Sequence, residues 1–264
     1  MYGSEKRYVE NNLLKKIAYT LFGELHVPGR LRAYHVIKKI EEIGLNKKKG
    51  LRMLDAGSGR GDLVVCFAKN NSSWEITGVE IDAERLKIAR ETQSKDNLKN
   101  VNFIGKNLLD EDIAGKFDLI TCCDVLEHID DDVSVMEKFH QLLDNNGVLL
   151  LTFPSIPQRT HLKLVSWREK KIGFKNEDYG HVRDGYSVAG ISKTLKEIGF
   201  QNIDCRYTFG FWGTLCFDLF FIIGDNRPNP IIFFLTFPAL MMLAFLDLHF
   251  PSKQGSALLV TARK

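Results

Sequence analysis

The sequence lacks a strong charge of either sign. Its 36 lysine and arginine residues nearly balance 33 aspartate and glutamate residues, and the formal net charge is only +3. This balance gives no reason to expect nucleic acid as a partner. With 44% apolar and 26% charged residues, the chain also lacks the composition of a disordered or collagen-like protein. Its 264 residues are enough for one large folded domain.

The sequence also lacks the cysteine patterns of disulfides and zinc sites, and it lacks a secretory signal. The cysteine count, five, is odd, and no Cys-x-x-Cys or Cys/His pair has the spacing of a zinc site. The segment from Met1 to Tyr19 is charged throughout and has neither the apolar core nor the small-residue cleavage site of a secretory signal. We therefore expect reduced thiols and a cytoplasmic protein.

The apolar pattern predicts alternating strands and helices. Short runs rich in β-branched residues predict strands, and the segments between them are long enough for helices. Because strands joined by crossover helices run parallel, this order predicts a parallel sheet with helices on both faces. The predicted strands are 52–56, 75–81, 101–104, 117–122, 148–153, 202–208 and 257–262, and the predicted helices between them are 61–70, 83–94, 133–143 and 187–198.

Two turn signals refine this pattern. Pro28 and Gly29 interrupt the helical periodicity between Glu10 and Gly44, which predicts two helices that form a lid over the rest of the chain. The run from Asp144 to Gly147 predicts a turn just before the strand 148–153.

The strongest motif is the glycine-rich loop Asp55-Ala56-Gly57-Ser58-Gly59-Arg60-Gly61, which follows the first predicted strand and opens a helix. Glycines at such a junction let backbone N–H groups approach an anionic group. Glu80 ends the second strand, where an acid can accept hydrogen bonds from ribose hydroxyls. Together they predict a ribose-containing cofactor, whereas the loop alone would also fit a tight strand-to-helix connection. The acid before the first glycine and the Gly-x-Gly-x-Gly spacing favour a nucleoside other than NAD or FAD.

The chain resembles the class I S-adenosylmethionine-dependent methyltransferases, particularly type 11 and ubiquinone-pathway O-methyltransferases. The resemblance covers residues 51–154 well and the rest in outline. It implies an α/β fold: one doubly wound, Rossmann-like domain with a seven-stranded, mostly parallel sheet, and S-adenosyl-L-methionine as cofactor. The segments that carry it are Leu54 to Gly61, Gly78 to Asp82, Phe117 to Ile120, Val125 to Ile129, Leu142 to Leu143 and Gly147 to Phe153.

On this basis we expect a single methyltransferase domain over residues 1–264. Its parts are a helical lid (1–50), a cofactor-binding core (51–154), an acceptor-side region (155–208), an apolar insertion (209–250) and the last strand (256–264).

The resemblance also implies which residues bind the cofactor. Asp55 and the backbone at Gly57 would hold the methionine end, within the loop that also contains Ser58, Gly59 and Gly61. Glu80 would bind the ribose hydroxyls, and Ile81 would pack on the adenine.

Three further positions complete the implied site. Family members usually have an acid after the third strand to receive the adenine amino group. This sequence has Asn107 followed by Leu108 there, and an Asn oxygen can accept the same hydrogen bond. Cys123 matches a position whose backbone contacts the cofactor's amino-acid moiety, and Arg32, or Arg30, would reach its carboxylate from the lid. A solvated helix face is the alternative for either arginine.

Two histidines are candidates for catalysis. A hydroxyl acceptor must lose a proton, and a neutral imidazole suits that role near pH 7. His128 follows the fourth strand at the cofactor edge of the sheet, although it would also fit a helix cap. His181 is a second candidate base, with an exposed loop histidine as the alternative.

A metal site is a weaker hypothesis. Asp124, Glu127 and His128 form Asp-x-x-Glu-His, and positions three and four apart share one face of a helical turn. In ubiquinone-pathway relatives a similar acidic pair plus histidine, with Glu in place of the first Asp, is associated with a divalent metal. Because Leu-Glu-His is common in methyltransferases without a metal, we do not predict one.

The apolar insertion contains two runs, 211–223 and 231–250. A spanning helix needs about 20 apolar residues. The first run is too short, and the second contains Pro238, Asp247 and His249, so we do not expect a spanning pair. Two alternatives stay open. One is a buried cap, and the other is a monotopic hairpin that contacts the inner membrane face as a peripheral element and admits a lipophilic acceptor.

We therefore expect methyl transfer to an oxygen, or less readily a carbon, of a lipophilic small molecule such as a quinone or isoprenoid lipid. The first alternative is a soluble acceptor such as a sugar or natural product. The second is a non-catalytic, membrane-associated module that only binds the cofactor.

Overall fold

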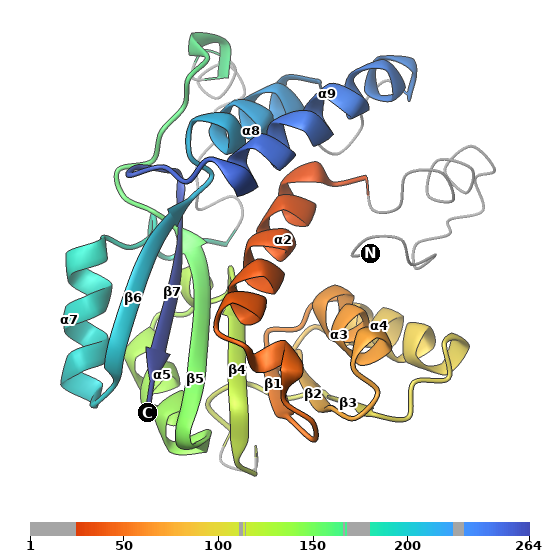
Figure 1. The fold of residues 1–264 in the computed structure, drawn as a ribbon, viewed down its shortest axis with the longest axis vertical. Helices are drawn as coiled ribbons and strands as arrows, with labels where there is room; N and C mark the ends of the chain where they lie inside the picture. Colours follow the sequence, from red (N-terminus) through yellow and green to blue (C-terminus); the bar gives the residue numbers. More distant parts are fainter. Residues whose placement is uncertain (1–24, 111–112, 114, 166, 168–179, 224–229) are drawn as a thin grey trace.

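A mostly parallel sheet of seven strands forms the centre of the molecule (Figure 1). The computed structural model describes residues 25–110, 113, 115–165, 167, 180–223 and 230–264. The strand order is β3-β2-β1-β4-β5-β7-β6, and β7 is antiparallel to both of its neighbours. The predicted doubly wound, Rossmann-like fold is thus confirmed. The strands are β1 (Arg52–Ala56), β2 (Glu75–Val79), β3 (Val101–Ile104), β4 (Phe117–Cys123), β5 (Leu143–Pro154), β6 (Gln201–Thr208) and β7 (Ala257–Arg263).

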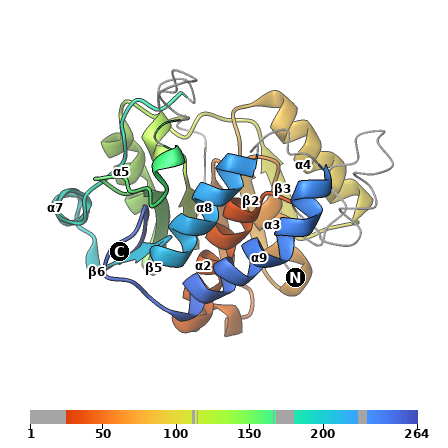
Figure 2. The same cartoon turned by 90° about the horizontal axis from the view of Figure 1, so that it is seen from above.

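Helices cover both faces of the sheet, as predicted. Figure 2 places α5 and α7 on one side and α3 and α4 on the other. The first predicted lid helix, between Glu10 and Gly29, falls mostly outside the described residues. The helices are α2 (Val27–Glu42), η1 (Leu45–Lys47), α3 (Asp62–Asn70), α4 (Ala83–Lys95), η2 (Leu126–His128), α5 (Asp132–Leu142), α7 (Val188–Ile198), α8 (Phe211–Ile223) and α9 (Pro230–His249).

The start of α2 differs from the prediction of a break at Pro28 and Gly29. The helix begins at Val27, so both residues lie in its first turn. Proline is tolerated there because the first N–H groups of a helix have no intrahelical partner. The ring of His26 caps this turn, since its Nδ1 accepts the N–H of Gly29 at 3.0 Å.

The predicted turn at 144–147 is also different, because these residues belong to β5. The register against β4 shifts between the pairs Phe117–Leu143 and Leu119–Val148, so the four residues form an irregular section of the strand. Asn146 has a φ of 62°, a left-handed conformation that asparagine tolerates better than most residues. The turn signal marked a real distortion, but the strand pairing continues past it.

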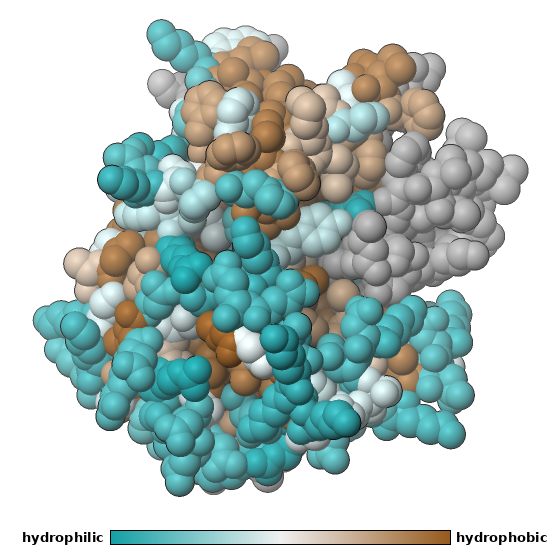
Figure 3. Space-filling model, in the orientation of Figure 1, coloured by the Kyte–Doolittle hydropathy of each residue, from teal (hydrophilic) through white to brown (hydrophobic). Residues whose placement is uncertain are grey.

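The apolar insertion forms α8 and α9, which pack on each other and on α2. Together they lie over the carboxyl ends of the parallel strands (Figures 1 and 2). Figure 3 shows this part of the surface as the most hydrophobic region of that face of the molecule. Among the described residues, no helix combines the length and hydropathy needed to cross a bilayer.

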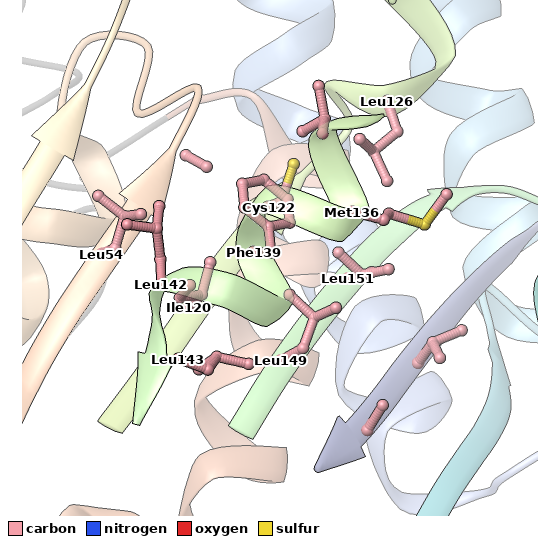
Figure 4. Close-up of a cluster of buried hydrophobic side chains, with 14 of the residues drawn as sticks. Leu54, Ile120, Cys122, Leu126, Met136, Phe139, Leu142, Leu143, Leu149 and Leu151 are labelled. Atoms are coloured by element: carbon pink, nitrogen blue, oxygen red, sulfur yellow. The ribbon is translucent and has the colours of Figure 1, made fainter. Parts of the chain in front are cut away.

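The core consists of one apolar layer on each face of the sheet. Side chains alternate along a strand, so Leu149 and Leu151 of β5 pack against α5 and α7, whereas Val148 and Leu150 face α2 and α3. Figure 4 shows the first layer, where Phe139 of α5 lies among strand leucines. This packing fixes the strand ends that carry the candidate site.

Candidate active site

A cavity of about 1130 Å³ opens at the carboxyl ends of β1, β2 and β4, beneath α2. Ligands bind at this edge in open α/β sheets, and typical ligand cavities are about 300–1,000 Å³. The cavity therefore has room for a nucleoside cofactor and a second molecule. Of the residues predicted for the site, it is lined by Arg32, Asp55, Gly57, Ser58, Gly59, Glu80, Ile81, Asn107, Leu108, Cys123 and His128, whereas Gly61 and His181 are not among its lining residues.

Glu80 and the glycine-rich loop form one hydrogen-bonded unit. The N–H of Gly59 donates to Oε2 of Glu80 at 2.7 Å, and the N–H of Asp82 donates to Oε1 at 2.9 Å. The Glu80 side chain is buried and lines the cavity. Its carboxylate is therefore held in one orientation, with lone pairs left for ribose hydroxyls.

The loop amides are used differently from what the sequence suggested. The N–H groups of Gly57 and Ser58 both donate to the Val79 carbonyl, at 2.9 and 2.8 Å, and that of Gly61 donates to the Ser58 carbonyl. The first two amides tie the loop to β2, and the third closes a turn within the loop, so these three do not face an anion. Gly57 can thus offer its carbonyl to a cofactor ammonium group. The buried Ser58 hydroxyl has no hydrogen-bond partner among the described residues.

Glycine is required at two positions of the loop for steric reasons. Gly57 has a φ of 74°, and a Cβ there would lie 2.3 Å from Cγ2 of Val125. Gly61 has a φ of 77°, and its Cβ would lie 2.6 Å from the Phe103 ring. Gly61 therefore serves the close packing of helix and strand, which explains why it does not line the cavity.

Asp55 is a buried carboxyl with a perturbed pKa. Its Oδ1 accepts the hydroxyl proton of Thr121 at 2.6 Å. Burial raises the pKa of Asp55 to about 6, the Thr121 hydrogen bond opposes the shift, and the charges of Glu80 and Asp62 add to it. A cation bound in the cavity would favour the ionised form, so Asp55 suits an ammonium group. Thr121 was not predicted as a site residue, although a polar residue within an apolar strand is a signal for one.

The adenine side of the predicted site is present with one difference. Ile81 is 69% exposed at the cavity wall, and Leu108 is buried beside it. Asn107 already uses its Oδ1 to accept the N–H of Leu109 at 3.0 Å. Its side chain is therefore fixed by a local turn, and only the second lone pair of that oxygen is left for a ligand.

Arg32 lies at the cavity, whereas Arg30 does not. Arg32 forms an ion pair with Asp124, and its buried Nε has no hydrogen-bond partner among the described residues. Arg30 is buried on another side of α2, where its Nη2 donates to the Tyr34 hydroxyl at 2.9 Å and its guanidinium lies over the Phe237 ring. Of the two arginines, Arg32 is the one that a ligand carboxylate could reach.

Cys123 ends β4 at the cavity wall. Burial raises the pKa of its thiol, so the side chain is not a nucleophile. The position therefore fits the expected backbone contact.

His128 lines the cavity, and His181 lies next to it. Their rings meet edge to face with centroids 4.6 Å apart. Nδ1 of His128 lies 3.1 Å from the Gly180 carbonyl, so that nitrogen carries the proton and Nε2 is left as the acceptor. Burial and the nearby His128 lower the pKa of His181, which favours its neutral form.

Glu127 forms a cluster with His128 and His181. Glu127 is 1% exposed, and its Oε2 has no hydrogen-bond partner among the described residues. Nδ1 of His181 also has no hydrogen-bond partner among these residues. Burial, and then the charge of Asp124, raises the pKa of Glu127 to about 8. One ligand atom each from Glu127, His128 and His181 lies within 4.8 Å of the others.

The trio that can hold a metal therefore differs from the one considered in the sequence. η2 begins only at Leu126, and Asp124 has a φ of 53°, so Asp124 is not on the same helical turn as Glu127 and His128. Its carboxylate binds Arg32 and the Thr152 hydroxyl instead. One carboxylate and two imidazoles suit a divalent transition metal, and the two unpartnered buried atoms fit such an ion.

Comparison with known proteins agrees with this geometry. The sequence model of the methyltransferase domain family matches residues 47–197. A ubiquinone biosynthesis O-methyltransferase from Psychrobacter arcticus is 32% identical over 170 residues, which are 63% of this chain and 64% of that protein. The mitochondrial enzyme of the same name from Saccharomyces cerevisiae is 29% identical over 129 residues, 48% of this chain and 39% of that protein. The chain thus spans less than two thirds of either relative.

Among solved structures, the fold is similar to that of phosphoethanolamine N-methyltransferase 2 from Haemonchus contortus, which was determined in complex with S-adenosyl-L-methionine. The TM-score is 0.55 at 18% identity, and the match covers 82% of this chain and 49% of that one.

Proposed function

Because this chain belongs to the methyltransferase domain family, we propose that it transfers a methyl group from S-adenosyl-L-methionine to an oxygen of a lipophilic small molecule. The observation that carries this proposal is the cavity in which Asp55, the glycine-rich loop and Glu80 meet beneath α2. It combines groups for the two ends of the cofactor with space for a second reactant.

Groups that line the cavity support this proposal for both ends of the cofactor. Asp55 and the carbonyl of Gly57 would bind the ammonium group, and Arg32 would bind the carboxylate. The fixed carboxylate of Glu80 would accept hydrogen bonds from the ribose hydroxyls. Ile81 offers an exposed apolar side chain for the adenine.

The chemistry requires alignment and removal of one proton. When bound, S-adenosyl-L-methionine supplies a methyl group on a positively charged sulfur. The protein must hold the acceptor in line with it and exclude water. His128 lines the cavity with Nε2 as a free acceptor, so it would take the hydroxyl proton. His181 contacts the His128 ring and would support this base.

Two observations favour a lipophilic acceptor. The two relatives described above carry the name ubiquinone biosynthesis O-methyltransferase. In addition, the apolar helices α8 and α9 pack on α2, which covers the cavity. A quinone or isoprenoid lipid would fit these features, and the protein would then act as a peripheral protein on the cytoplasmic face of a membrane.

A label-transfer experiment tests the proposal. The protein is incubated with methyl-labelled S-adenosyl-L-methionine and a cell extract, and the products are separated into organic, aqueous and protein fractions. We expect label in the organic fraction for wild type and none for Asp55→Ala, because that variant lacks the group for the ammonium end. Asp118→Ala is a control, since this carboxylate lies on β4 away from the cavity and pairs with Lys48.

The same experiment separates the alternatives. Label in the aqueous fraction would indicate a soluble acceptor such as a sugar or natural product, and α8 and α9 would then be only a structural cap. Cofactor binding without label in any fraction would indicate a non-catalytic module.

A further inference from the structure

We propose that the outer face of α8 and α9 is a membrane-docking surface that fits a bilayer containing anionic lipids. This inference rests on the proposed function, because a lipophilic acceptor would come from such a bilayer. It names the partner and the residues that would contact it.

The outer face is large and apolar. Along α9, the exposed positions follow helical spacing through Leu235, Met242 and Phe245, which are 71%, 58% and 57% exposed. On α8, Phe217 is 45% exposed. Exposed apolar surfaces mark interaction sites, and Figure 3 shows that hydrophobic residues predominate at the top of the molecule.

The only acidic residues of the two helices point inward. Asp218 accepts the N–H groups of His161 and Leu162 at 2.7 and 2.9 Å, and it is fully buried. Asp247 accepts the N–H of Gly213 at 2.8 Å and lies 2.9 Å from Nε2 of His35. Neither helix contains Lys, Arg or Glu. Within the described residues of α8 and α9, the outer face thus has no charged side chain, as expected for a surface that enters the apolar part of a bilayer.

Basic side chains flank this apolar face. Lys38 and Lys253 are exposed at the end of α9 and line a smaller cavity of about 450 Å³ there. Lys38 donates to the Leu248 carbonyl, and neither lysine has an ion-pair partner among the described residues. Lys163 is exposed next to the backbone that Asp218 holds against α8. Lysines around an apolar face favour anionic lipid headgroups at the membrane surface.

The position of this face links docking to the active site. α2 lies between the pair α8–α9 and the main cavity. Leu31 packs against α8 and α9, whereas Gly29 and Arg32 line the cavity. The ring of His26, which also lines the cavity, meets Phe220 of α8 edge to face at 5.1 Å. Docking through α8 and α9 would therefore hold the start of α2, and the cavity wall that it forms, next to the bilayer.

Flotation with vesicles tests the docking surface. Wild-type protein is mixed with vesicles of phosphatidylcholine alone or with added phosphatidylglycerol. We expect it to float with the anionic vesicles, and we expect Leu235→Asp combined with Met242→Asp to reduce binding more than tenfold. Val133→Asp is the control, because Val133 is 43% exposed on α5, which is not part of the proposed docking face. Lys38→Gln and Lys253→Gln should each weaken binding a few-fold and lower its salt dependence.

Further measurements separate this proposal from the proposed function. The double variant should keep the wild-type affinity for S-adenosyl-L-methionine, which shows that it is folded and that its cofactor site is intact. Failure of wild type to bind either vesicle, or equal binding by the double variant, would overturn the docking proposal while leaving methyl transfer to be judged by the label experiment. A wild-type dimer that Leu235→Asp dissociates would assign the face to a second copy instead.

Discussion

The hydroxyl of Thr121 donates to the buried carboxyl of Asp55 at 2.6 Å, across the pairing of β1 with β4. Burial disfavours the ionised form of Asp55, and the hydrogen bond from Thr121 is the main polar contact that favours it. Cofactor binding through Asp55 should therefore depend on pH and on the residue at position 121.

The first prediction concerns pH. In the folded protein the pKa of Asp55 is raised from 3.8 to about 6, so between these values the folded state holds more protons than the unfolded state. The contribution of Asp55 to stability is therefore present at low pH and is lost as the pH rises through about 6. Binding of a cation has the opposite dependence, because it needs the ionised form.

Affinity for S-adenosyl-L-methionine should thus rise with pH up to about 6 and level off above, with about a tenfold loss per pH unit below that value. Isothermal titration calorimetry over this range measures the dependence. Asp55→Asn should bind weakly and without the inflection. An unchanged inflection in this variant would assign it to another group.

The second prediction concerns Thr121→Val. This change removes the hydroxyl and keeps the shape, so the pKa of Asp55 should rise further. A hydrogen bond to a charged group contributes about 1.5–3 kcal/mol, so affinity near neutral pH should fall about tenfold and the inflection should move upward. Thr121→Ser keeps the hydroxyl and is the control. Equal affinity in Thr121→Val and wild type would show that the bond does not support the ionised form.

The third prediction compares two glycines. Gly57→Ala would place Cβ 2.3 Å from Val125 at a φ of 74°, so strain and overlap combine, and we expect a loss of about 2–5 kcal/mol in the free energy of unfolding. Gly59 has a φ of 55° with nothing within 4 Å of a Cβ, so Gly59→Ala should lose only about 1–2 kcal/mol. Urea unfolding measures both. Equal losses would mean that Val125 moves aside.

Much of the fold could be predicted because it depends on local patterns. β1 and β3 match the predicted residues, since short apolar runs between helices have few other places to pack. α8 also matches the predicted apolar run 211–223. β2 ends at Val79, two residues before its predicted end. The larger differences were at turn residues, because Pro28 and Asn146 can be accommodated inside an element when the neighbouring backbone pairing is favourable.

The site was predictable only where the chain itself sets the geometry. The glycine-rich loop and Glu80 meet because β1 and β2 are adjacent parallel strands. The neighbours of Arg32 and Glu127 depend on how segments that are distant in the sequence pack together. No spacing in the sequence links Glu127 to His181. Asp124 was assigned to a helical turn, and its left-handed backbone could not be foreseen from sequence.

The fourth prediction concerns the contact of α8 and α9 with α2. Asp247→Ala would remove the acceptor of both the Gly213 N–H and His35, leaving a buried N–H without a partner. We expect a loss of about 2–4 kcal/mol in the free energy of unfolding. The control is Glu197→Ala, which breaks an exposed pair with Lys193 and should change stability by less than about 0.5 kcal/mol. Similar small losses in both variants would contradict a structural role for Asp247.

The last prediction concerns the cluster of Glu127, His128 and His181. If these residues hold a divalent metal, Mn²⁺ should bind to the protein, and electron paramagnetic resonance measures the free and bound ion directly. Glu127→Gln and His181→Ala should each weaken binding at least tenfold, because each removes one of three ligands. Cofactor affinity in the same variants serves as the control for folding.

Asp124→Asn distinguishes this trio from the one that the sequence suggested. Asp124 is bound to Arg32 and Thr152, and its charge raises the pKa of Glu127. Replacing it with a neutral residue should leave Mn²⁺ binding unchanged or make it tighter, since Glu127 would ionise more readily. A strong loss in Asp124→Asn would instead mean that Asp124 leaves Arg32 and becomes a ligand. No binding by wild type would exclude Mn²⁺ at this cluster.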